Sequence, residues 1–278
     1  MASFAGAFAA SHGPLLVREW ESVPADQKQR LTRAFQELGK RVSAARADVL
    51  VAVSPDHWAN FSLDNYPAVC IGVGETNEGP PEPWMKAYPH RQIPAHPGLA
   101  FHLLNQSLGE GFEPSMSHRL KLDHGTCIPL WRMELAKMPA IVPMLVNSIE
   151  PPMPSLARCL AWGKLLRKAI ESYPGDLRVG ILATGGLSHS IGEPTMGEID
   201  EPFDRECIRH FEKGDERPLI DFLNERLPTI GNGAAEIRNW VAAHGAADRR
   251  GFELIGYCNC PEVYVGCGFA SWNLGARA

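Results

Sequence analysis

Two kinds of segment alternate along this chain, and the alternation restricts the folds open to it. Continuous apolar runs occupy residues 4–10, 49–53, 141–146 and 177–183. Between them lie segments with an apolar residue every three or four positions, which is the spacing of one helical face. Strands that are apolar on both faces and alternate with helices are typical of a largely parallel sheet covered on each side. The sequence therefore predicts a three-layer α/β/α fold around a central, largely parallel (mixed) sheet.

The ends of the predicted helices carry recognisable signals. Residues 154–172 form the strongest helical pattern, which Ser155 starts and Gly175 ends. Residues 79–94 form a long proline-rich loop, and loops of that length are often functional or lid-like. No linker composition divides the chain, so we expect a single catalytic domain over residues 1–278.

Composition excludes several classes of partner. The formal net charge is −5 and no long basic run occurs, which argues against nucleic acid and anionic membrane. No apolar stretch approaches the roughly 20 residues that cross a bilayer. The seven cysteines are odd in number and scattered, which favours a reducing compartment such as the cytoplasm. Cys258, Cys260 and Cys267 lack a fourth ligand at zinc spacing, so we interpret them as small apolar fillers.

Three of the apolar runs lead into a histidine: His12, His57 and His189. The carboxyl ends of parallel strands share one edge of a sheet, where ligands bind in open α/β folds. We therefore expect the three imidazoles to converge, although they are far apart in sequence. A fourth histidine, His124, precedes a predicted short helix. Any one of them is more often a hydrogen-bonded loop residue than a ligand, but three histidines after three apolar strands favour a common site.

Carboxylates near these histidines allow two interpretations each. Asp56 and Asp123 stand beside a histidine and either orient its ring or cap a turn, with about equal weight. Glu236 begins a predicted helix, whose dipole would keep it ionised as a metal ligand must be. It is also placed as a capping-box glutamate, three residues after Gly233, and spacing alone slightly favours that role. Two imidazoles and one carboxylate would leave adjacent positions open on a metal, as Fe(II) oxygenases require.

Five motifs around these residues occur together in one known family. They are ASHGP at 10–14, SPDHW at 54–58, DHG at 123–125, GGLSH at 185–189 and EIRNW at 236–240. In order and spacing they resemble the class III extradiol ring-cleavage dioxygenases, most closely the catalytic β subunit of protocatechuate 4,5-dioxygenase. The likeness runs from about Ser11 to Trp240 and more weakly to Asn273. Any one motif alone is a weak signal, whereas five in order are specific.

The resemblance implies a role for each matching residue. His12, His57 and Glu236 match the family's Fe(II) ligands. His189 matches its catalytic base, and His124 matches a second active-site histidine that positions or protonates the oxygen-derived group. The implied reaction is extradiol cleavage of a catechol-type diol, such as protocatechuate, gallate or a related, possibly heterocyclic, diol, with both atoms of O₂ incorporated.

The resemblance also implies partners. Related enzymes are usually homo-oligomers, and in some a small α-type subunit or fused domain covers the site. This sequence contains no segment that matches that cover. The substrate is not specified, because no single arginine or lysine stands out as a partner for a substrate carboxylate.

Two other functions remain open at this point. The same His, His and Glu set also suits Zn²⁺ and activates water, so a zinc-dependent hydrolase is the alternative. A hydrolase would act without O₂. A non-catalytic binding protein on the same scaffold is a third interpretation. The presence of all five polar residues argues against it, and metal analysis would separate it from the enzymes.

Overall fold

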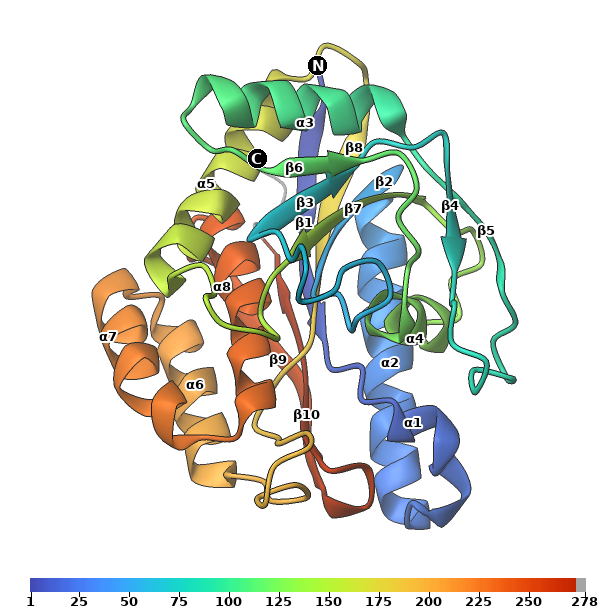
Figure 1. The fold of residues 1–278 in the computed structure, drawn as a ribbon, viewed down its shortest axis with the longest axis vertical. Coiled ribbons are helices and arrows are strands. Elements are labelled where there is room, and N and C mark those ends of the chain that lie inside the picture. The colour runs from blue at the N-terminus through green and yellow to red at the C-terminus, as the bar shows by residue number, and fades with distance from the viewer. Residues whose placement is uncertain (274–278) are drawn as a thin grey trace.

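The computed structural model describes residues 1–273, which form an eight-stranded sheet between two layers of helices (Figure 1). In chain order the strands are β1 (Ser3–Ala10), β2 (Val49–Ser54), β3 (Val69–Gly72), β6 (Ser115–Ser117), β7 (Ala140–Val146), β8 (Arg178–Thr184), β9 (Phe252–Cys260) and β10 (Val265–Trp272). The helices are α1 (Leu15–Arg18), α2 (Ala25–Ala45), α3 (Pro97–Gly109), α4 (His124–Arg132), α5 (Leu156–Ser172), α6 (Glu201–Lys213), α7 (Glu216–Arg226) and α8 (Ile237–Ala246).

The strand order across the sheet is β6-β3-β7-β2-β8-β1-β10-β9. The central neighbours β7, β2, β8 and β1 are all parallel. Antiparallel pairing occurs toward the two edges, between β3 and β7, between β1 and β10, and between β10 and β9. The predicted α/β fold with a mixed, largely parallel central sheet is therefore confirmed. The last five residues of the single domain expected over 1–278 lie outside the described part.

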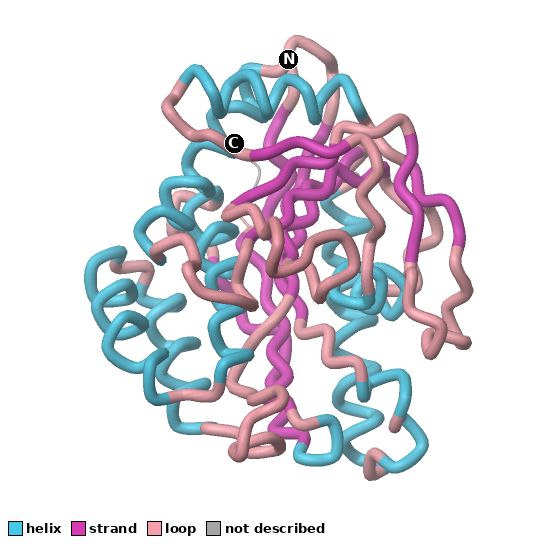
Figure 2. The backbone as a smooth tube through the Cα atoms, in the orientation of Figure 1, coloured by secondary structure: helices cyan, strands magenta, loops and turns pink. Residues whose placement is uncertain are grey.

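Alternation along the buried strands fills two cores, one on each face of the sheet. In β2, Val49, Val51 and Val53 point to the core beneath α5 and α8. Leu50 and Ala52 point to the opposite core, beneath α2 and α4. Figure 2 shows the resulting central layer of strands between helices. Burial on both faces explains why the strand sequence reads as a continuous apolar run.

Two parts of the chain differ from the sequence expectation. The loop predicted over residues 79–94 is flanked by a separate two-stranded ribbon, β4 (Thr76–Gly79) and β5 (Arg91–Pro94). The short helix predicted to follow His124 begins at His124 itself, because the Asp123 side chain accepts a hydrogen bond from Gly125 N and caps it. Among residues 1–273, no helix is long and apolar enough to cross a membrane.

The contact between α5 and α8 is unusually close because a glycine faces a main-chain carbonyl. A Cβ added at Gly163 of α5 would overlap the carbonyl oxygen of Ala242 in α8. The helix backbone cannot give way as a flexible side chain would. This packing fixes the start of α8, which follows Glu236 directly.

We predict that Gly163→Ala lowers the free energy of unfolding by about 1–3 kcal/mol, as overpacking does. The higher helix propensity of alanine contributes only about 1 kcal/mol in the other direction. Gly109→Ala, at an exposed helix end with nothing within 4 Å of the added Cβ, is the matched control and should change stability by less than about 1 kcal/mol. Chemical denaturation of both variants measures the difference, and equal stabilities would contradict the packing argument.

Candidate metal centre

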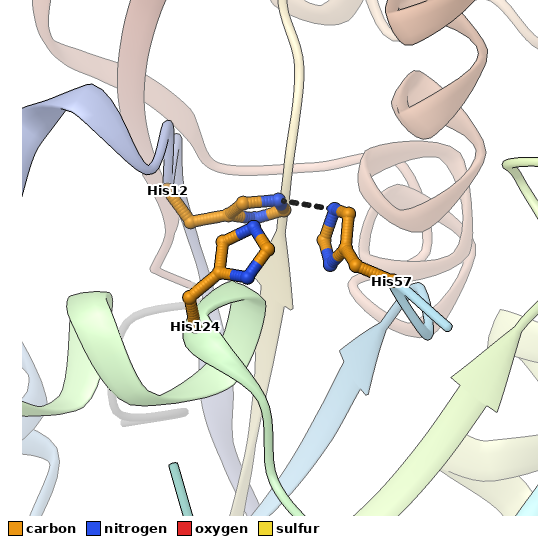
Figure 3. Close-up of side chains that lie close together, drawn as sticks. All are labelled: His12, His57 and His124. Carbon is orange, nitrogen blue, oxygen red and sulfur yellow. Dashed lines mark hydrogen bonds between the residues drawn. The ribbon is translucent and has the colours of Figure 1, made fainter. Parts of the chain in front are cut away.

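The parallel strands β1, β8 and β2 are neighbours, and their carboxyl ends meet at one edge of the sheet. His12 follows β1, His57 follows β2, and His189 lies in the loop after β8. Figure 3 shows His12 and His57 with their rings directed toward one another and with His124, at the start of α4, beside them. The convergence expected from the strand ends is therefore seen for His12 and His57, and His124 joins them from α4.

Three donor atoms meet at the centre of this edge. His12 Nε2 lies 3.2 Å from His57 Nε2 (Figure 3). Glu236 Oε1 lies 3.2 Å from His57 Nε2 and 3.5 Å from His12 Nε2. Adjacent ligands about 2.1 Å from one ion lie ~3.0 Å apart when they subtend a right angle. The three separations therefore fit a small divalent cation, held by two imidazoles and one carboxylate.

Glu236 reaches the histidines from the end of a 3-10 turn over Asn232–Glu236. The main-chain N–H of Gly233, which a capping-box glutamate would accept, instead donates to the carbonyl oxygen of His189 at 3.2 Å, so the carboxylate does not act as a capping-box group. Its second oxygen, Oε2, instead accepts a hydrogen bond of 2.9 Å from Gly186 N. Position 185 must be glycine here, because a Cβ would overlap this carboxylate.

Asp123 orients the ring of His57. Its Oδ2 accepts hydrogen bonds from His57 N at 2.7 Å and from His57 Nδ1 at 3.0 Å. With the proton on Nδ1, the lone pair of Nε2 faces His12 and Glu236. Asp123 thus orients a histidine, although not its sequence neighbour His124. Asp56 has the other expected role and caps a turn, since it accepts hydrogen bonds from the main-chain N–H groups of residues 60 and 61.

The electrostatics of the cluster favour positive charge at its centre. Burial alone would lower the pKa of His57, but the carboxylates of Asp123 and Glu236 outweigh it and raise the pKa to about 10. Burial would raise the pKa of Glu236, yet His12 and His57 hold it well below its usual range. Glu236 is therefore an anion surrounded by imidazoles, and a metal cation suits such a site.

His124 is held by a residue that the sequence did not indicate. Its ring centroid lies 4.1 Å from that of His57 and 5.7 Å from that of His12. Glu82 Oε1 accepts hydrogen bonds from His124 N at 2.9 Å and from His124 Nδ1 at 2.7 Å. The other ring nitrogen, Nε2, is buried and has no hydrogen-bond partner within residues 1–273. Glu82 comes from the loop between β4 and β5, whose Trp84 also contacts the His124 ring.

His189 is buried, and its ring is fixed by the main chain. Its Nδ1 lies 2.9 Å from the carbonyl oxygen of Leu187, which can only accept, so Nδ1 carries the proton. Gly233 lies against the ring so closely that an added Cβ would overlap Nε2. A pocket of about 380 Å³ with a mixed polar and apolar lining, including Ser190 and Asp200, lies beside His189.

A family model described as the catalytic LigB subunit of aromatic ring-opening dioxygenase matches residues 6–265. The chain belongs to the LigB family. The matched stretch contains all five site residues expected from the sequence, which are His12, His57, His124, His189 and Glu236.

Individual relatives agree with this LigB assignment. A 2,3-dihydroxyphenylpropionate/2,3-dihydroxicinnamic acid 1,2-dioxygenase of Photorhabdus laumondii is 25% identical over 282 residues, covering 85% of this chain and 86% of that protein. Its namesake from Mycobacterium ulcerans is 31% identical over 201 residues, covering 72% of this chain and 61% of that protein. A gallate dioxygenase of Pseudomonas putida is 31% identical over 162 residues, covering 55% of this chain and 46% of that protein.

A solved structure matches the fold of this LigB protein over nearly its whole length. It is an uncharacterized protein from Escherichia coli K12, with a TM-score of 0.65 and 17% sequence identity. The match covers 95% of this chain and 98% of the other. At that identity the likeness supports the three-layer fold and nothing finer.

Asp204 is a second buried carboxyl group that sequence reasoning missed. It lies in α6 and accepts hydrogen bonds from Ser188 and from Tyr257 of β9. Burial raises its pKa to about 7, against the effect of these hydrogen bonds, and the nearby Asp200 carboxylate adds to the rise. The sequence carried no signal for this residue, because its partners come from distant elements.

We predict that Asp204 makes the stability of this LigB protein depend on pH. A carboxyl group whose pKa is raised by folding contributes stability that is fully present below its unfolded pKa of about 4. That contribution is lost as pH rises through about 7. The free energy of unfolding of the wild type should therefore fall, relative to Asp204→Asn, between about pH 4 and pH 8. Chemical denaturation across this range measures the difference, and a constant difference would show that Asp204 does not titrate there.

Proposed function

We propose that this LigB-family protein is a non-haem Fe(II)-dependent extradiol dioxygenase that opens the ring of a catechol-type diol with O₂. The observation that carries the proposal is the meeting of His12 Nε2, His57 Nε2 and Glu236 Oε1 within 3.5 Å of one another. The relatives support the reaction class, since those named above are dioxygenases of dihydroxyphenylpropionate and of gallate. Protocatechuate, gallate and related diols, including heterocyclic ones, are the substrates to test.

The residues present suit the proposed metal. His12, His57 and Glu236 would hold it, and two imidazoles with one carboxylate on one side are the ligand set of non-haem Fe(II) oxygenases. When bound, the metal would bring diol and O₂ together and let charge pass between them. Asp123 contributes by keeping the lone pair of His57 directed at the metal position.

His189 is proposed as the base that accepts a hydroxyl proton from the diol. Because its Nδ1–H donates to the carbonyl of Leu187, its Nε2 carries the lone pair. The ring is buried, and a pocket of about 380 Å³ lies beside it. The loop that carries His189 also contains Gly186, whose N–H donates a hydrogen bond to Glu236. This bond fixes the loop of the proposed base relative to the proposed carboxylate ligand.

His124 is proposed to position or protonate the oxygen-derived group. Glu82 accepts the proton on its Nδ1, which leaves the buried Nε2 without a protein partner within residues 1–273. Burial and the nearby His57 lower the pKa of His124, although the hydrogen bond to Glu82 opposes them. His124 and His189 therefore differ in what stands behind each ring, a carboxylate in one case and a neutral carbonyl in the other.

Several finer expectations belong to this proposal. The catalytic unit is taken to be the single domain over residues 1–278. The protein is expected in the cytoplasm, since all seven of its cysteines are free and buried. A homo-oligomer, and a small α-type subunit over the site, remain predictions from family resemblance. Size measurement of the purified protein tests the oligomer.

Oxygen uptake by the Fe(II)-loaded protein tests the reaction directly. With a panel of catechols that includes protocatechuate, gallate and a dihydroxypyridine, we expect O₂ consumption and a yellow ring-opened product from at least one diol. Consumption should match ring opening one to one, because both oxygen atoms enter the product. A zinc-dependent hydrolase using the same residues would act under anaerobic conditions with Zn²⁺. Anaerobic turnover without O₂ uptake would therefore replace the proposal with that alternative.

Variants should separate the metal ligands from the proposed base. His12→Ala and His57→Ala should lose most bound iron, and Glu236→Gln should weaken iron binding. His189→Phe should keep its iron and lose turnover by at least about 100-fold. His118→Ala removes an exposed histidine and serves as the control, with iron and turnover unchanged. Full iron in the first two variants, or full turnover in His189→Phe, would remove the residue concerned from its assigned role.

A further inference from the structure

The loop that carries His189 is attached to β10 by main-chain hydrogen bonds. Leu187 N donates to Gly266 O at 2.8 Å, and Gly266 N donates to Ser188 O at 3.0 Å. A third bond of 3.2 Å, from Gly233 N, ends on the carbonyl of His189 itself. These bonds fix the path of the loop, but they leave the side chain of Ser188 to be placed by another element.

Asp204 supplies that placement from α6. Its Oδ1 accepts Ser188 N–H at 2.8 Å, and its Oδ2 accepts Ser188 O–H at 2.9 Å. Ser188 Oγ in turn accepts the N–H of Asp200 at 2.9 Å. Ser188 is therefore held by three hydrogen bonds, two to Asp204 in the first turn of α6 and one to Asp200, which precedes α6.

The donors around the Asp204 carboxylate are all neutral. Besides Ser188, the third donor is the hydroxyl of Tyr257, at 2.8 Å. Asp204 is fully buried, and no salt bridge to it occurs within residues 1–273. A buried carboxyl group without a cationic partner is costly to the fold. Such a group is better explained by what it holds in place than by a contribution to stability.

We propose that Asp204 is a positioning residue, which sets the ring of His189 by fixing Ser188. Its catalytic meaning rests on the proposed function, because His189 matters to turnover only if it is the base. The ring is held between the carbonyl of Leu187 and the surface of Gly233, so a shift of Ser188 moves the ring against both. A misplacement of about 1 Å at a reacting group lowers the rate by up to about 100-fold.

Three variants distinguish positioning from simple stability. Asp204→Asn keeps the shape of the side chain but leaves Ser188 O–H without its acceptor. Ser188→Ala removes the same hydrogen bond from the other side. Tyr257→Phe removes a hydrogen bond from the same carboxylate without touching Ser188, and is the matched control. Unfolding of each variant is measured alongside its kinetics.

We expect Asp204→Asn to lower kcat about ten-fold or more, with KM for the diol and bound iron within about two-fold of wild type. Tyr257→Phe should keep kcat within about two-fold at a similar loss of stability. The Asp204→Asn/Ser188→Ala double variant should turn over no more slowly than Asp204→Asn alone, because both changes break one link. Equal kcat values for Asp204→Asn and Tyr257→Phe, or additive losses in the double variant, would overturn the proposal.

A structural readout separates this inference from the proposed function. Crystal structures of the Asp204→Asn and Tyr257→Phe proteins should differ at His189. The 2.9 Å contact between Nδ1 and the Leu187 carbonyl should persist in Tyr257→Phe and be broken in Asp204→Asn. An unmoved ring in Asp204→Asn would overturn the positioning role, whatever the reaction. If the wild type opens no diol, the proposed function fails, and this comparison still decides what holds the ring.

Discussion

The parallel pairing of β1, β8 and β2 is the constraint on which the site depends. It brings three strand ends to one edge, so residues 12 and 57 meet although 45 positions separate them. The carboxylate arrives by a different route, because Glu236 is placed by the packing of α8 on α5. The three side chains thus reach one point from two parts of the fold, the sheet edge and the start of one helix. For the proposed metal centre, grouping of the ligands by the fold would lower the cost of holding a cation in a fixed geometry.

The hydrogen-bond acceptor at Nδ1 of each imidazole determines which ring nitrogen carries the proton. His57 is backed by the carboxylate of Asp123, His124 by that of Glu82, and His189 by a neutral main-chain carbonyl. In each case the outer ring nitrogen carries the proton, so Nε2 is the nitrogen left for the centre of the site. Identical side chains thus reach the same small volume with different protein groups behind them. The differences arise from neighbours that belong to other elements of the chain.

The sequence predicted the part of this site that follows from strand order and missed the part that follows from packing. Apolar runs identified the strands, and the shared edge of a parallel sheet then placed His12 and His57 together. Glu236 could not be chosen by spacing, since a capping role fits the same position, and only family resemblance favoured it. Glu82 and Asp204 were missed because their partners lie in distant segments. The sequence pattern indicates β10 less clearly than the central strands, because glycines interrupt its apolar run.

Glu82 belongs to the segment between β4 and β5, a two-stranded ribbon separate from the main sheet. His12 and His57 instead follow β1 and β2, which lie at the centre of the main sheet. Two parts of the fold therefore meet at His124, the central sheet and the separate ribbon. A change confined to the ribbon would alter the contacts of His124 but leave in place the strand ends that carry His12 and His57.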